Sequence, residues 1–408
     1  MLGALYRRSF LKAIAALGAC AASGKTHASS PGLRFGPAIP FSFDGLKEAA
    51  RQLSRAPYRP PRAPAPEITA LIDYDVWGQI SCKADHALRV NDQARFPVEF
   101  FHLGALYPKA VTVHSVVNGE AREVLYDPNH FDTPENSIAR RLPPMAGFGG
   151  VKIQEPIHGQ LDWRKNDWVA FLGASYFRAI GALRQYGVSA RGVALDTWQM
   201  GAQEEFPDFT QFYIGPETAD GIYVHALLEG PSIAGAYRFL LTRGAGVVMD
   251  VECALFLRRA VTRFGVAPLT SMYWFSETHK TASNDWRPEV HDSDGLAIWN
   301  GAGERLWRPL NNPAGVVASA FLDNNPKGFG LLQRDRVFDH YLDGVAYDRR
   351  PSVWVEPKGD WGKGAIQLIE IPTSDEAQDN IVAMWVPDKP ATAGAAFDFS
   401  YRLHLSLI

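Results

Sequence analysis

The feature that most constrains the fold is a long succession of short runs rich in β-branched and aromatic residues. Such runs include FPVEFFHL (96–103), GIYVHALLEG (221–230), GVVMDVECALFLR (246–258) and NIVAMWVP (380–387). Gly, Pro, Asn and Asp separate them, and helical periodicity is almost absent between them. Many strands at this spacing predict an all-β protein built as a large antiparallel β-sandwich.

One helix is expected before the strands begin. Leu46, Ala49, Ala50 and Leu53 share one face of a helical pattern, and the proline-rich stretch that follows ends it. At the other end of the chain, VPDKPATAGAA has the composition of a linker, and FDFSYRLHLSLI alternates as one further strand. Because a single strand cannot satisfy its own ladder hydrogen bonds, it either joins the main sandwich or begins another domain.

The N-terminus has the features of an export signal. An arginine pair (Arg7 and Arg8) precedes a short apolar stretch and then small residues up to Ala28. This pattern predicts a twin-arginine signal peptide over residues 1–28 and therefore a periplasmic protein. Cleavage near Ala28 is preferred, and lipidation at Cys20 in LGAC is the alternative. No other stretch is long and apolar enough to predict a membrane domain.

Composition and motifs exclude several classes of function. The 44 acidic and 41 basic residues nearly balance, so nucleic acid is not an expected partner. The sequence contains no GxSxG, HExxH or CxxC motif and no GxGxxG after a strand, so no cofactor or metal is predicted. Cys82 and Cys253 are the only cysteines beyond the leader, and whether they pair is left open.

Carboxylate chemistry remains, and two stretches supply candidates. In EIPTSDEAQDNIVAMW, Asp379 stands just before an apolar strand that could raise its pKa and keep it protonated. In HDSDG, Asp292 and Asp294 lie in a glycine-rich, aromatic loop. A protonated carboxyl and an ionised one are what glycoside cleavage requires. The alternative is that both stretches are ordinary turns.

Aromatic residues near these acids are candidate sugar-binding surfaces, because flat rings pack against the apolar faces of sugars. Trp286, Trp361 and Trp385 are the predicted stacking residues, and Arg287 is a predicted polar contact.

Several long phrases carry a resemblance to a known family. They include FLGASYFRAIG, YGVSARGVALDT, RPEVHDSDGL, WVEPKGDWGKG and LIEIPTSDEAQDNIVA. The chain resembles the periplasmic glucan biosynthesis proteins of the MdoG/MdoD (OpgG/OpgD) group from about Phe41 onward, and its leader is more like the MdoD/OpgD branch. The resemblance implies a sandwich of the galactose-mutarotase-like type over residues 29–390. It also implies that residues 391–408 are a linker and the first strand of a truncated immunoglobulin-like domain.

The resemblance further implies a role in making osmoregulated periplasmic glucans. The implied activity is that of an inverting β-1,2-glucanase or a related transglycosylase acting on the glucan backbone without a cofactor. Carried over by motif, the general acid falls on Asp379, the general base on Asp292, and a hydroxyl relay between water and base on Tyr347. Two other functions remain open: a glucan-binding scaffold that assists an inner-membrane synthase, and an epimerase of mutarotase type, which needs a His and Glu pair in the pocket.

Overall fold

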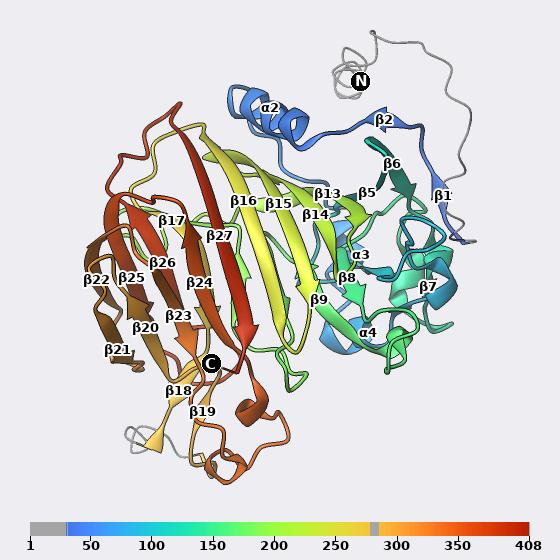
Figure 1. Ribbon diagram of the computed structural model, residues 1–408. Coiled ribbons are helices and arrows are strands. Elements are labelled where there is room, and N and C mark those ends of the chain that lie inside the picture. The colour runs from blue at the N-terminus through green and yellow to red at the C-terminus, as the bar shows by residue number, and fades with distance from the viewer. Residues whose placement is uncertain (1–29, 31, 278–284, 408) are drawn as a thin grey trace.

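The computed structural model describes residues 30, 32–277 and 285–407, and two large β-sheets form its body (Figure 1). The sheets pack face to face around one apolar core. At its centre, Phe171 and Phe177 of one sheet contact Phe239 of the other. The ring centroids of Phe171 and Phe177 lie 5.3 and 5.1 Å from that of Phe239, and 5.5 Å from each other. The predicted all-β sandwich is therefore confirmed. The predicted signal peptide lies outside the described residues.

The larger sheet has thirteen strands in the order β1-β6-β5-β13-β14-β15-β16-β27-β24-β23-β20-β21, with β2 beside β6. Its pairs are antiparallel except that of β5 with β13, which is parallel. The strand bounds are β1 Arg34–Phe35, β2 Ile39–Pro40, β5 Thr112–Val117, β6 Glu120–Leu125, β13 Asp208–Glu217, β14 Gly221–Glu229, β15 Ile233–Arg243, β16 Val247–Leu257, β20 Gly295–Trp299, β21 Arg305–Pro309, β23 Gly328–Leu332, β24 Ser352–Lys358 and β27 Ala396–Ser406.

Strand β27 corrects the expected domain boundary. It pairs along its length with β16 on one side and β24 on the other, in the middle of the larger sheet (Figure 1). Its alternate residues, Phe397, Phe399, Tyr401, Leu403 and Leu405, are buried in the core. The prediction that residues 391–408 open an immunoglobulin-like domain was wrong for this strand, because two long ladders and an apolar face fix it in the sandwich.

The smaller sheet has ten strands in the order β22-β25-β26-β17-β11-β10-β9-β8-β4, with β12 beside β17. Their bounds are β4 Val98–Phe101, β8 Gly150–Gln154, β9 Asp167–Leu172, β10 Tyr176–Ala179, β11 Ser189–Arg191, β12 Val193–Leu195, β17 Phe264–Ser271, β22 Val317–Asn324, β25 Lys363–Glu370 and β26 Ile381–Pro387. Two further sheets have two short strands each: β18 Tyr273–Phe275 pairs with β19 Val290–His291, and β3 Ser81–Cys82 pairs with β7 Phe131–Asp132.

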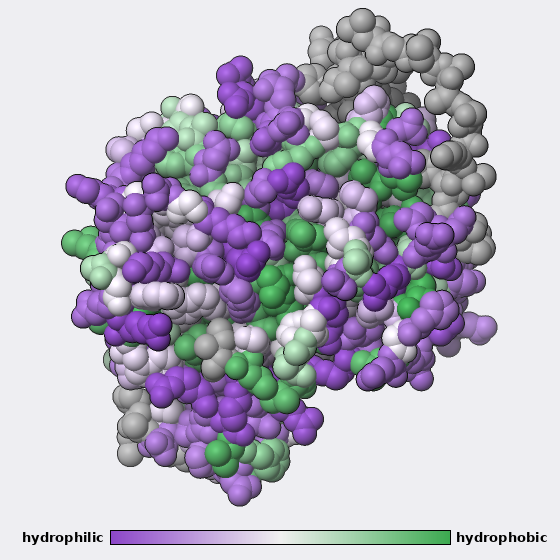
Figure 2. Space-filling model, in the orientation of Figure 1, coloured by the Kyte–Doolittle hydropathy of each residue, from purple (hydrophilic) through white to green (hydrophobic). Residues whose placement is uncertain are grey.

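In the described part of the chain, helices are few and short. They are α2 Phe43–Ser54, α3 Pro66–Thr69 and α4 Tyr74–Gly78, with 3-10 turns η1 Ala84–His86, η2 Pro128–His130, η3 Ile138–Arg141, η4 Trp163–Lys165, η6 Phe338–His340 and η7 Tyr347–Arg349. The predicted helix is α2, which begins where the Ser42 hydroxyl caps the Gly45 N–H at 3.0 Å. Leu46 and Ala50 pack on the outer face of the larger sheet, and the outward side of α2 is polar (Figure 2).

Two further expectations concern the membrane and the cysteines. Within the described part of the chain, no helix has the length and apolar character needed to cross a membrane. Cys82 and Cys253 are free thiols, and Cys253 is buried in the core on β16.

Candidate active site

The candidate site is formed by segments that are distant in the sequence. The β18–β19 pair and residues 333–351 lie below the sheets in the view of Figure 1. Asp292 follows β19 directly, Arg350 follows η7, and Asp379 stands two residues before β26. The outer face of the smaller sheet adds two arginines, Arg178 on β10 and Arg191 at the end of β11. The site is thus built from loop residues anchored to rigid strands.

Asp292 is a buried carboxylate, only 5% exposed. Its backbone N–H donates to the Met272 carbonyl at 2.8 Å, and its Oδ1 accepts a hydrogen bond from Arg350. Burial raises the pKa of Asp292 to about 6; the positive charge of Arg350 opposes this rise, and the negative charge of Asp379 adds to it. The two aspartates are therefore close enough for one charge to influence the other.

Asp379 differs from Asp292 because solvent reaches its side chain. Protein atoms nevertheless crowd around it, and this desolvation raises the pKa of Asp379 against the opposing charges of Arg178, Arg191 and Arg350. Asp292 is the more shielded of the two carboxyl groups.

The neighbouring Asn380 fixes the position of Asp379. Its Oδ1 accepts the N–H of Tyr273 at 2.8 Å, and its Nδ2 donates to the carbonyls of Tyr273 and Ile371, both at 2.9 Å. These bonds join the start of β26 to β18. They add to the backbone bonds of Asn380, whose N–H donates to the Ser271 carbonyl at 3.1 Å and whose carbonyl accepts the Ile371 N–H at 2.9 Å. The end of β26 is therefore held in place where the acidic run 375–379 leads into it.

Tyr347 lies beside Asp292 but its hydroxyl points to another acid. The Tyr347 hydroxyl donates to Glu376, and the Tyr347 ring lies under the guanidinium of Arg350, 4.4 Å from the ring centroid. Burial and the hydrogen bond to Glu376 raise the pKa of Tyr347, and the charge of Asp292 adds to this rise. The arrangement contains no direct hydrogen bond between Tyr347 and Asp292 among the contacts of the described residues.

Arg287, which was predicted to contact sugar, forms ion pairs with three acidic side chains of the protein. Its guanidinium is 7% exposed and binds Asp285 at 2.8 Å, Glu376 at 2.8 Å and also Asp343. It therefore joins three loops, one of which carries Tyr347 and another Asp379. The structure gives Arg287 a positioning role and corrects the expected contact with substrate.

The three predicted tryptophans separate into two groups. Trp286 is 71% exposed next to the anchored Arg287, as a sugar-stacking surface must be. Trp361 is 6% exposed and Trp385 is 0% exposed, and their rings pack 6.1 Å apart in the core. The predictions for Trp361 and Trp385 were wrong, because side chains enclosed between the sheets cannot meet a sugar.

Asp294, the alternative to Asp292, serves the local backbone. Its Oδ2 accepts the N–H groups of Arg334 and Asp335 at 3.1 and 3.2 Å, which holds the turn after β23. These hydrogen bonds account for a carboxylate at position 294 without a catalytic role.

His291 and Glu289 form a buried pair near the two aspartates. His291 is 0% exposed and its Nε2 lies 2.7 Å from Glu289 Oε2. Because His291 is enclosed, this pair cannot act on a sugar as an epimerase would require.

Sequence reasoning missed three residues of the site. Arg178 is an exposed residue on a strand, which resembles an ordinary solvated position. Arg191 lies opposite Tyr176 in the register of β10 and β11, holds Glu204 at 2.9 Å and covers the Tyr176 ring at 4.8 Å. Glu376 was counted among the acids of its loop but given no partner. Only cross-strand register or the folded loop could have identified them.

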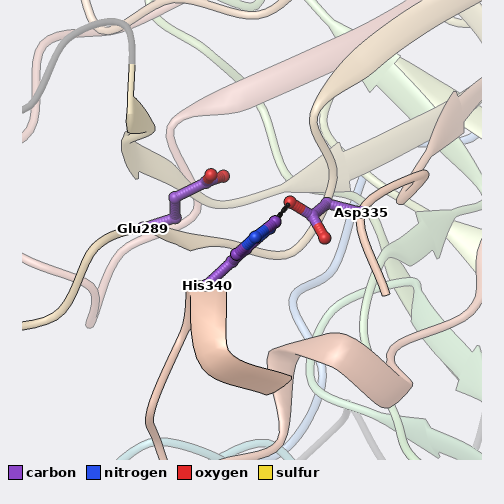
Figure 3. A group of neighbouring side chains, drawn as sticks. All are labelled: Glu289, Asp335 and His340. Atoms are coloured by element: carbon purple, nitrogen blue, oxygen red, sulfur yellow. Dashed lines mark hydrogen bonds and ion pairs between the residues drawn. The ribbon is translucent and has the colours of Figure 1, made fainter. Parts of the chain in front are cut away.

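One group of side chains in the described residues has donor atoms arranged as a metal site could use them. Glu289, Asp335 and His340 place one donor atom each within 4.8 Å of the others (Figure 3). The group lies on the far side of His291 from Gln333, and none of its members is one of the two aspartates above.

Comparison with known proteins places the chain in a family. A profile described as "Periplasmic glucan biosynthesis protein, MdoG" matches residues 41–407. The chain belongs to this family. It is 58% identical to glucans biosynthesis protein D 2 of Ralstonia nicotianae, over 91% of this chain and 70% of that protein. It is 46% identical to glucans biosynthesis protein D of Stenotrophomonas maltophilia, over 98% of this chain and 76% of that one.

Membership of the periplasmic glucan biosynthesis proteins supports a role in glucan biosynthesis in the periplasm. The names of these relatives agree with the D branch of the resemblance.

Solved structures are only distantly similar. A galactose mutarotase related enzyme from Lactobacillus acidophilus is 9% identical, with a TM-score of 0.23 over 57% of this chain and 95% of that chain. An α-N-acetylgalactosaminidase from Bifidobacterium bifidum is 12% identical, with a TM-score of 0.28 over 57% of this chain and 35% of that one.

Proposed function

We propose that this protein cleaves or transfers the β-1,2-glucan backbone of periplasmic glucans, with inversion at the anomeric carbon. Asp379 is the general acid and Asp292 the general base. The observation that carries the proposal is a continuous set of contacts: Arg350 binds Asp292 and covers the Tyr347 ring at 4.4 Å, and the Tyr347 hydroxyl donates to Glu376 in the loop that carries Asp379. Two carboxyl groups whose pKa values are shifted from the usual range are what glycoside cleavage uses.

Asp379 suits the role of acid for two reasons. Its side chain is open to solvent, so a glycosidic oxygen can approach it, and its pKa is raised, so it retains a proton to higher pH. In the reaction, the Asp379 carboxyl gives its proton to the glycosidic oxygen as the bond from that oxygen to the anomeric carbon breaks. Arg178, Arg191 and Arg350 then stabilise the carboxylate that remains.

Asp292 suits the role of base only through an intermediary, because it is 5% exposed. Water attacks the anomeric carbon from the face opposite the leaving oxygen and releases a proton. Tyr347 accepts that proton at its hydroxyl oxygen and passes its own hydrogen on to Asp292. This step requires the Tyr347 hydroxyl to turn away from Glu376, its partner in the structure. Glu376 is consequently a competing acceptor that the experiment must distinguish.

The test is incubation of the purified protein with linear β-1,2-glucan while chain length and new reducing ends are measured. We expect shortening, or redistribution of length if transfer dominates, and an inverted anomer by NMR of the first product. Asp379→Asn and Asp292→Asn should each lower kcat by about 10²-fold or more. If Asp292 accepts the proton, Glu376→Gln should lower kcat far less than Asp292→Asn does. If Glu376 accepts it, Glu376→Gln should lower kcat as much as Asp292→Asn was expected to.

The other candidate is a glucan-binding scaffold that serves an inner-membrane synthase. Trp286, which is 71% exposed, would serve binding equally well. A protein that binds the polymer, never shortens it and is unchanged by Asp379→Asn would establish the scaffold instead. Export by the twin-arginine route is a further part of the proposal, and mutation of Arg7 and Arg8 to lysine with measurement of periplasmic protein would test it.

A further inference from the structure

A second cluster of ionisable side chains lies outside the proposed catalytic pair. Glu289 precedes β19, Asp335 follows β23, and His340 ends η6, so the cluster joins two segments far apart in the sequence. Figure 3 shows the carboxylates of Glu289 and Asp335 on either side of the His340 ring, with a hydrogen bond from His340 to Asp335. Their donor atoms all lie within 4.8 Å of one another.

Hydrogen bonds from outside the cluster hold one oxygen of each carboxylate. Glu289 Oε2 is held by His291 Nε2 at 2.7 Å, and Asp335 Oδ1 accepts the Val337 N–H at 3.0 Å. Asp335 Oδ2 and His340 Nδ1 are joined to each other at 2.6 Å, so an ion bound here would take the place of the proton between them. Outer hydrogen bonds of this kind orient metal ligands in known sites. Here they hold both carboxylates in place before any ion arrives.

The charge around the cluster is not balanced by basic side chains. In residues 30, 32–277 and 285–407, neither Glu289 nor Asp335 forms a salt bridge with a lysine or an arginine. Glu289 is only 5% exposed, so its charge is not dispersed by water. A cation would neutralise this excess of negative charge.

We propose that Glu289, Asp335 and His340 form a binding site for a divalent transition-metal ion, Zn²⁺ or Mn²⁺. One imidazole and two carboxylates are a ligand set that these ions accept, whereas Ca²⁺ and Mg²⁺ favour oxygen ligands throughout. With bonds of about 2.0–2.2 Å, ligand atoms stand roughly 3–4 Å apart, which a small side-chain rotation achieves here. Water completes the coordination. The ion links β19, which leads to Asp292, to the segment before η7, and takes no part in glucan cleavage.

The experiment is calorimetric titration of the full, EDTA-treated and dialysed chain with ZnCl₂, MnCl₂ and CaCl₂. We expect one Zn²⁺ or Mn²⁺ ion per chain and weaker Ca²⁺ binding. His340→Ala and Asp335→Asn should each weaken binding at least roughly tenfold, because each removes a ligand. His340 and Asp335 are not buried, so these variants should fold. Added Zn²⁺ should raise the Tm of the wild type and not that of His340→Ala.

The matched control is His404→Ala. His404 Nε2 binds Glu356 Oε2 at 2.7 Å in a similar imidazole–carboxylate pair, and the described residues place no third ligand beside it. This variant should bind the ion as the wild type does. Absence of stoichiometric binding by the wild type, equal affinity of His340→Ala, or equal loss in His404→Ala would each overturn the proposal. None of these readouts depends on glucan, so the outcome is independent of the proposed activity.

Discussion

Arg350 pairs with the buried carboxylate of Asp292 while its guanidinium covers the ring of Tyr347 at 4.4 Å. One side chain thus adjoins both the proposed base and the proposed relay. Removing it affects the charge state of Asp292 first, because the positive charge of Arg350 lowers the pKa of a carboxyl that burial raises to about 6.

Arg350→Gln should move the acidic limb of the pH profile to higher pH. Without the opposing charge the pKa of Asp292 rises, by roughly 1–3 units for loss of a close opposite charge, and the base ionises later. The measurement is kcat/KM for β-1,2-glucan from pH 4 to pH 9. Arg349→Gln is the control, because Arg349 is exposed and contacts Asp348 instead. An unchanged limb in Arg350→Gln, or the same shift in both variants, would contradict the assignment.

Asp292→Asn should change how stability depends on pH. The pKa of Asp292 is about 6 in the folded protein, and a carboxyl of the unfolded chain titrates near 3.9. The folded state therefore keeps a proton that the unfolded state has lost, and its stabilising effect disappears as pH rises through 6. The free energy of unfolding of the wild type minus that of the variant should fall by roughly 2–3 kcal/mol from pH 4 to pH 7. Urea unfolding at each pH measures it, and a flat difference would show that Asp292 is not shifted.

Arg287→Ala should destabilise the loops of the site. It leaves Asp285, Asp343 and Glu376 together without their shared cation, and loss of one partner of a buried ion pair costs about 3–5 kcal/mol. Urea unfolding measures the loss, and cleavage should fall with it. Arg305→Ala is the control, since Arg305 is exposed and only covers the Trp299 ring at 4.9 Å; it should cost about 1 kcal/mol or less.

Trp286→Ala and Trp361→Ala should separate binding from folding. Trp286 is exposed, so its removal should leave the Tm unchanged and raise KM roughly 2- to 10-fold through loss of an aromatic contact. Trp361 is enclosed, so its truncation should cost about 3–5 kcal/mol in unfolding free energy. A stable Trp361→Ala, or a Trp286→Ala with unaltered KM, would contradict these roles.

The fold class was predictable because many β-rich runs and turn residues point to the same architecture. The orientation of individual aromatics was not. Val382 and Met384 are buried on one face of β26, and Ile381, Ala383 and Trp385 on the other. A strand that is apolar on both faces gives no alternation from which to tell where Trp385 points. Trp286 lies in a loop between polar residues, and this polar sequence already indicates an exposed side chain.

The site was predictable only in part. The sequence indicated Asp379 by the change from acid to apolar strand and offered Asp292 and Asp294 in HDSDG; the resemblance selected Asp292 and added Tyr347. The arginines came from the fold, because Arg191 and Arg178 reach the site through the pairing of β10 and β11 with β17. The prediction that the last strand begins an immunoglobulin-like domain was wrong for a similar reason. Its partners β16 and β24 are distant in the sequence, and the linker-like composition before it suggested that it was separate from the sandwich.

The place of β27 has a consequence for biogenesis. The two halves of the larger sheet, from β1 to β16 and from β24 to β21, are joined through this strand alone in the ladder. The sandwich can therefore not close until residues 396–406 have left the ribosome. Until then the nascent chain keeps the edges of β16 and β24 unpaired, and open strand edges of this kind can pair with other chains.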